Sequence, residues 1–72
     1  MGTLLDSLTP RRIQVAVLLM QGCMNKDIAK ELGMGLRTVK AHLAWMFNKF
    51  GIENSAKHKR VQLATILYEA GK

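Results

Sequence analysis

The sequence predicts an all-α domain of four helices, in which the second and third helices are joined by a short turn as in a helix-turn-helix motif. Two observations carry this prediction. Apolar residues recur at the three- and four-residue spacing of amphipathic helices, and no stretch alternates as a β-strand does. Glycine-containing breaks separate the periodic stretches, which places helices at about 10–21, 25–32, 36–50 and 59–70. Residues 1–72 are expected to form one domain, because a chain of this length builds a single modest core.

The first helix, 10–21, is expected to start at Thr9 and Pro10. A threonine side chain caps the free N–H groups of a first turn, and proline suits the first helical position because it lacks an N–H. Apolar side chains cover most of the circumference of this helix, so we expect it to be heavily buried. Gly22 provides the stop.

The second helix, 25–32, is expected to begin with Asn25 as its cap. Asp27 lies in the first turn, where a negative charge interacts favourably with the helix dipole. Ala29 is small enough to let another helix cross closely. Gly33 permits the left-handed backbone conformation that ends a helix, and it opens the turn to the third helix.

The third helix, 36–50, separates into two faces at 100° per residue, and we interpret it as the recognition helix. One face is an apolar stripe that anchors the helix, formed by Leu36, Val39, Leu43, Met46, Phe47 and Phe50. The other face mixes cations with small residues, so long donors reach base edges and phosphates while the backbone lies deep in the major groove of DNA. That face consists of Arg37, Lys40, Ala41, Ala44 and Asn48.

The last helix, 59–70, follows a segment without periodicity that we interpret as a loop. Apolar residues surround too much of this helix for one small core to cover, so part of its surface is expected to contact another protein chain. The predicted contact residues are Val61, Thr65, Ile66 and Tyr68.

The charge of the chain favours a polyanionic partner. Eleven Lys and Arg residues against five Asp and Glu residues give a formal net charge of +6. Nucleic acid is therefore the first expected partner and an anionic membrane surface the second. The longest apolar run is far too short to span a bilayer, and no secretion signal is present, so we expect a cytoplasmic protein without a membrane segment.

The chain offers no catalytic or metal-binding pattern. Cys23 is the single cysteine, which excludes an internal disulfide, and His42 and His58 stand apart from any thiol. There is no Ser-His-Asp arrangement, no pair of carboxylates on one helix face and no glycine-rich phosphate loop. We therefore expect neither an enzyme nor a bound cofactor or metal.

Several motifs occur together in a fixed order and cover most of the chain. They are Leu8-Thr9-Pro10-Arg11, Gly22, Asn25-Lys26-Asp27-Ile28-Ala29, Leu32, Thr38-Val39-Lys40-Ala41-His42 and Lys49-Phe50-Gly51-Ile52. With them the chain resembles the C-terminal DNA-binding domain of LuxR-type (GerE- and FixJ-like) transcriptional regulators, a group that includes the output domains of many two-component response regulators. The combination of the third-helix motif with the downstream Lys49-Phe50-Gly51 is its most specific part.

The resemblance implies that the third helix enters the major groove of double-stranded DNA and that the fourth makes a symmetric dimer contact. It also implies an N-terminal receiver or sensor domain in the full-length protein. The family's base-contacting positions correspond to Lys40, Ala41 and Ala44, with Thr38 and neighbouring cations at phosphates. Together with the face analysis, this predicts DNA contacts by Arg37, Thr38, Lys40, Ala41, His42, Ala44, Asn48 and Lys49.

Some residues depart from the family pattern. Arg12 replaces the usual Glu, so the reciprocal capping box at Thr9 is expected to be lost. Gly35 replaces a Ser cap, and Ala44 replaces a polar or basic base reader. The loop at 53–59 is longer than usual, so its cations either add phosphate contacts or displace the start of the last helix; they are Lys57, His58, Lys59 and Arg60.

Alternatives remain open at this point. Trp45 lies beside the apolar stripe, where it either covers the last helix or marks a surface for another domain. His42 is either a packed orienting residue or a base reader. For the whole chain, the alternatives to a DNA-binding regulator are a sigma-factor-like region that reads a promoter element and a basic module that binds acidic proteins or membrane surfaces.

Overall fold

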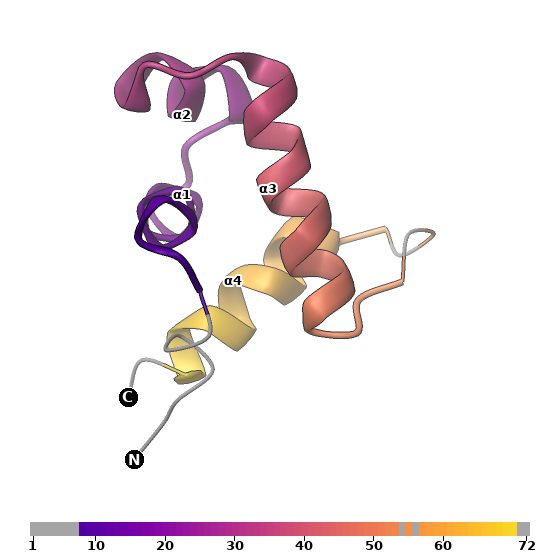
Figure 1. The fold of residues 1–72 in the computed structure, drawn as a ribbon. Coiled ribbons are helices and arrows are strands. Elements are labelled where there is room, and N and C mark those ends of the chain that lie inside the picture. The colour runs from indigo at the N-terminus through magenta and orange to yellow at the C-terminus, as the bar shows by residue number, and fades with distance from the viewer. Residues whose placement is uncertain (1–7, 54, 56, 71–72) are drawn as a thin grey trace.

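The computed structural model describes residues 8–53, 55 and 57–70. Over these residues the chain forms four α-helices and no strand: α1 at Pro10–Met20, α2 at Asn25–Leu32, α3 at Leu36–Lys49 and α4 at Lys59–Ala70 (Figure 1). The all-α fold class is confirmed. The ends of the predicted domain, 1–7 and 71–72, and two positions of the predicted loop, 54 and 56, lie outside the described residues.

The helix ends follow the predicted boundaries closely. The helices α1 and α3 each end one residue before the predicted limit, because Gln21 and Phe50 occupy the C-cap positions. Gly33 ends α2 in the left-handed conformation, with φ of +63°, and the N–H of Met34 returns to the carbonyl of Ala29 at 3.0 Å. Gly33 thereby sets the turn that orients α3 against α2.

The end of α3 uses the same device. Gly51 has φ of +72°, and the N–H of Ile52 reaches the carbonyl of Phe47 at 2.8 Å. The reversal brings the side chain of Ile52 back onto the core, where it is buried. The core thus gains a residue from the segment that leads toward α4.

The core draws on all four helices. Its buried side chains are Leu8, Val15, Ala16, Leu19, Ile28, Ala29, Val39, Leu43, Met46, Phe47, Ile52, Leu63 and Leu67. The apolar stripe of α3 therefore lies inward as predicted, with Phe50 partly buried at its end. Leu36 is the exception, since 44% of its surface is exposed at the first turn of α3. There it lines a surface hollow with Met24 and Lys26.

The expectation that α1 is heavily buried is wrong. Ile13, Val17 and Met20 are exposed, at positions one turn apart on the side of α1 turned away from the core. The other three helices pack against a single side of α1, which buries Val15, Ala16 and Leu19 only. A domain with so few helices leaves part of an apolar helix uncovered.

The cap predictions have mixed outcomes. Thr9 caps α1, because its hydroxyl accepts a hydrogen bond from the N–H of Arg12 at 3.3 Å; half of the capping box therefore survives. Asn25 does not cap α2. Met24 holds the cap position without a side-chain bond, and the Asn25 amide oxygen instead accepts a hydrogen bond from Arg60. Because α4 occupies the Asn25 side chain, it is withdrawn from the helix end.

The link between α4 and α2 is a double hydrogen bond. The guanidinium of Arg60 donates to the Asn25 side chain through Nη1 and to the backbone carbonyl of Cys23 through Nη2, the latter at 2.6 Å. Arg60 is half-buried in this position. It ties the first turn of α4 to the segment that opens the helix-turn-helix.

No helix among the described residues combines the length and the apolar character needed to cross a bilayer.

Candidate nucleic-acid interface

The outer face of α3 is open to solvent along its whole length. Seven of the eight predicted DNA-contact residues are exposed, and they are Arg37, Thr38, Lys40, Ala41, Ala44, Asn48 and Lys49. The opposite side of the helix is fixed, since Val39 and Met46 are fully buried. We call the exposed set Arg37, Lys40, Ala41, Ala44 and Asn48 the groove face. It combines long cationic donors with short side chains on a rigidly held helix.

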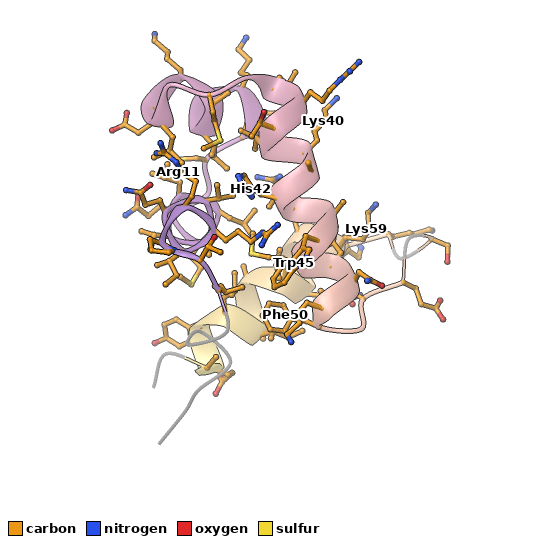
Figure 2. All side chains as sticks on the ribbon, in the orientation of Figure 1. Arg11, Lys40, His42, Trp45, Phe50 and Lys59 are labelled. Carbon is orange, nitrogen blue, oxygen red and sulfur yellow. The ribbon has the colours of Figure 1, made fainter. Side chains whose placement is uncertain are left out.

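One flank of the groove face carries lysines from three helices. Lys26 and Lys40 line a shallow hollow of about 320 Å³, and Lys40 and Lys59 line an adjoining one of about 330 Å³. The Nζ atom of Lys59 lies 5.2 Å from the centre of the Phe47 ring, so α4 holds this cation beside α3. Lys40 and Lys59 lie on the side of α3 away from α1 (Figure 2).

The cations around the loop are expected either to contact phosphates or to displace the start of the last helix, and the structure partly decides between these alternatives. The helix α4 starts at Lys59, and Lys57 and His58 are exposed before it. Arg60 is not available to a phosphate in this structure, because Asn25 and the Cys23 carbonyl occupy its guanidinium. Only Lys57, His58 and Lys59 therefore remain as candidates for phosphate contacts.

The other flank of α3 faces α1. Trp45 has a partner that neither sequence-based alternative anticipated: the guanidinium of Arg12 lies 4.0 Å from the centre of its ring. Trp45 is half-buried and packs against the core. The indole thus connects α3 to α1.

His42 lies on this second flank, and it is half-buried (Figure 2). Burial of the imidazole lowers the pKa of His42 below its ordinary value of 6.5, and the nearby charges of Arg12 and Arg11 lower it further. The ring is therefore predominantly neutral at pH 7. Its position supports a packed residue at the edge of the groove face more than a reader at its centre.

The outer side of α4 is apolar. Val61 is 64% exposed and Tyr68 is 62% exposed, and Thr65 lies between them on the same side of the helix. Ile66 differs from the prediction, because it is partly buried against the core with Leu63 and Leu67. It lies at the edge of the predicted contact surface and not within it.

The described residues contain no group of three side chains suited to hold a metal ion. The hollows on their surface are shallow and open; the two that Lys40 lines contain no carboxylate, and a third beside Ala44 and Asn48 includes Glu53.

A comparison with protein families connects this architecture to a known class. The family described as "Bacterial regulatory proteins, luxR family" matches residues 6–66. The chain belongs to this family. Its helix-turn-helix is that of a LuxR-family DNA-binding domain of a transcriptional regulator, and this assignment decides against the sigma-factor alternative.

Curated relatives agree with the family assignment. The chain is 44% identical to the transcriptional regulatory protein UhpA of Escherichia coli over 55 residues, which cover 76% of the chain and 28% of that protein. UhpA of Salmonella typhimurium is 44% identical over 52 residues, covering 72% and 26%. The C4-dicarboxylate transport transcriptional regulatory protein DctR of Rhodobacter capsulatus is 40% identical over 48 residues, covering 67% and 24%.

The chain therefore spans about a quarter of the length of these relatives. No solved structure gives a significant match.

Sequence reasoning missed several residues beside the groove face of this LuxR-family domain. Arg11 and Arg12 flank it from α1, and Arg60 braces the segment before α2. Periodicity within one helix carries no signal for such positions, because each depends on a neighbour brought close by the fold. The excess of positive charge was the available hint.

Proposed function

We propose that this chain is the sequence-specific reading domain of a bacterial transcription regulator and that α3 inserts into the major groove of double-stranded DNA. One observation carries the proposal: the groove face combines the short Ala41 and Ala44 with the cations Arg37 and Lys40 on a helix whose other side is buried. Small side chains let the backbone approach the bases, while the cations reach base edges and phosphates.

The roles of the side chains follow from their places on α3. Lys40, Ala41 and Ala44 are assigned to base edges, because the family's base-contacting positions correspond to them and all three are exposed. Thr38 and Lys49 are exposed on the flank that faces α1, where a hydroxyl and an ammonium suit phosphate oxygens. Arg37 and Asn48 lie toward the two ends of the helix, and His42 is assigned to the edge of the contact.

We further propose that two copies bind together through α4. The outer surface of α4 exposes Val61, Thr65 and Tyr68, while Ile66 contributes at its edge. A symmetric pair would place two α3 helices about 34 Å apart, one turn of DNA, on inverted half-sites.

The remaining parts of the proposal concern the whole regulator. The chain covers about a quarter of its relatives, so we propose that an N-terminal receiver or sensor domain controls it. The domain acts by binding and not by catalysis. A cytoplasmic location is proposed because chromosomal DNA is the ligand.

The test is selection of bound sites from a random duplex pool, followed by titration of the selected site. Lys40→Ala is expected to weaken binding by about 1–3 kcal/mol and to reduce the preference for the selected site over a scrambled duplex. The melting temperature should stay unchanged because Lys40 is exposed. Lys30→Ala removes the same charge from an exposed position of α2 and is the matched control.

Equal losses for Lys40→Ala and Lys30→Ala would contradict the assignment of Lys40. Binding to anionic vesicles without binding to any duplex would replace the proposal with the membrane-surface alternative.

A further inference from the structure

Two arginines and a histidine gather on the side of α3 that faces α1, across the helix from Lys40. Arg11 and Arg12 belong to the first turn of α1, and His42 belongs to the middle of α3. Figure 2 shows His42 on the side of α3 that faces α1, and Arg11 on α1 on the side toward α2. We call Arg11, Arg12 and His42 the α1-side cluster.

The guanidinium of Arg12 stacks on an aromatic ring, and one of its donors has no partner in the described part of the chain. It stacks on Trp45 at 4.0 Å from the ring centre, which orients the plane of the group. Its Nε atom is shielded from solvent and has no hydrogen-bond partner among the described residues. A shielded donor without an acceptor is unfavourable, so a small shift of the guanidinium that brings Nε to an oxyanion would relieve this cost.

The cluster also has an unbalanced positive charge. The side chain of Arg11 donates a hydrogen bond to the neutral amide oxygen of Gln14 at 3.1 Å, so this partner leaves its charge uncompensated. The pKa of His42 is lowered first by burial of the imidazole and then by the charges of Arg12 and Arg11, which disfavour a further cation there. Such a field attracts an anion.

We propose that Arg11, Arg12 and His42 form a phosphate-binding site that holds a phosphodiester group of DNA on the α1 side of α3. This inference rests on the proposed function, because it requires α3 in the major groove. A helix in that groove has a sugar-phosphate backbone on each side. Lys26 and Lys59, which flank Lys40, serve the backbone on one side, and the α1-side cluster serves the backbone on the other.

The chemistry of each member suits this role. Arg12 presents a planar pair of donors, fixed by Trp45, which fits two oxygens of one phosphate. Arg11 is exposed, so it can leave Gln14 and add a second charge-assisted contact. His42 is half-buried on the side of α3 that faces α1, and its ring N–H can donate to the same group.

The experiment measures the affinity of Arg12→Gln for two duplexes, the selected site and a 24-base-pair duplex of mixed sequence, across a series of salt concentrations. The plot of log affinity against log salt should lose about one unit of slope. The affinity should fall by a similar factor for both duplexes, because a phosphate contact carries no sequence information. Arg12→Lys should keep most of the slope, since it retains the charge.

Two controls separate a binding role from a structural one. Lys30→Gln removes one charge from an exposed position of α2 and should leave the slope nearly unchanged. Trp45→Phe keeps an aromatic ring beneath Arg12, and its slope should stay close to that of the original chain. Thermal unfolding of every variant shows whether the helices remain packed.

The possible outcomes are distinct. An unchanged slope for a folded Arg12→Gln, with binding still dependent on Lys40, would overturn the phosphate site and leave the proposed function standing. A loss confined to the selected duplex would also overturn it, because that pattern marks a base contact. If the original chain binds neither duplex, the proposed function itself fails.

Discussion

Two surfaces of this small domain differ sharply in chemistry although both rest on the same core. The groove face of α3 exposes Arg37, Lys40, Ala41, Ala44 and Asn48 and no large apolar side chain. The surface shared by α1 and α4 exposes large apolar side chains, namely Ile13, Val17, Met20, Val61 and Tyr68. We call the latter the apolar face.

The apolar face is continuous across the two helices. Met20 of α1 and Ala64, Thr65 and Tyr68 of α4 line one hollow of about 240 Å³. A contiguous apolar surface on a small protein marks a contact with another protein, whereas a cationic face with small residues marks a polyanion. The contrast teaches that the two proposed partners of this domain, DNA and a second protein chain, call for surfaces of opposite chemistry, and that the domain offers one of each.

The largest expected effect is on the free energy of unfolding. It tests whether one side of α4 supports the core while the opposite side is not needed for folding. Leu63→Ala removes a fully buried side chain from the core and should lower the free energy of unfolding by about 2–5 kcal/mol. Val61→Ala changes the outer side of the same helix and should cost no more than about 0.5 kcal/mol at concentrations where the domain is monomeric. Urea unfolding followed by Trp45 fluorescence measures both.

If Val61→Ala lowers the free energy of unfolding as much as Leu63→Ala does, the outer side of α4 already supports the fold. The distinction between the two faces would then fail.

The predictable parts of the molecule are those determined by local chemistry. The buried stripe through Val39, Leu43 and Met46 follows from helical periodicity, and the end of α2 follows from the left-handed preference of Gly33. The same periodicity separates the groove face from the core. Residues on these two features could be placed without knowing which helices pack together.

The unpredicted parts depend on pairs that are distant in the chain. Asn25 fails to cap α2 because Arg60, 35 positions later, binds its side chain. Trp45 packs under Arg12, although its spacing within α3 says nothing about α1. The exposed stripe of α1 has a similar origin, since periodicity reports which residues are apolar and not how many helices are present to cover them.

A smaller effect tests what the apolar face contacts. Thr65→Glu introduces a charge at the centre of the outer side of α4 and should reduce cooperative binding to an inverted repeat by about tenfold, or 1.4 kcal/mol. Affinity for a single half-site should stay the same, because the groove face is unaltered. Gel-shift titration on duplexes with one and two half-sites distinguishes the two quantities.

Gln62→Glu is the matched control, since it adds the same charge to α4 at an exposed position off the line through Val61 and Thr65. Unchanged cooperativity for Thr65→Glu, or an equal loss for both variants, would argue against a dimer contact through this surface.

The smallest expected effect is a pH dependence of the free energy of unfolding that arises from His42, at the edge of the groove face. The pKa of His42 in the folded domain lies below its ordinary value of 6.5, because burial and the charges of Arg12 and Arg11 disfavour the imidazolium. The unfolded chain therefore binds a proton at His42 more readily than the folded domain does. As the pH falls below about 6.5, the free energy of unfolding should decrease, while above that value His42 contributes no slope.

Urea unfolding at a series of pH values should show this decrease for the original chain and a weaker one for His42→Gln. His58→Gln removes the exposed loop histidine and should retain the decrease. Identical slopes for the original chain and His42→Gln would show that the cations of α1 do not act on this residue.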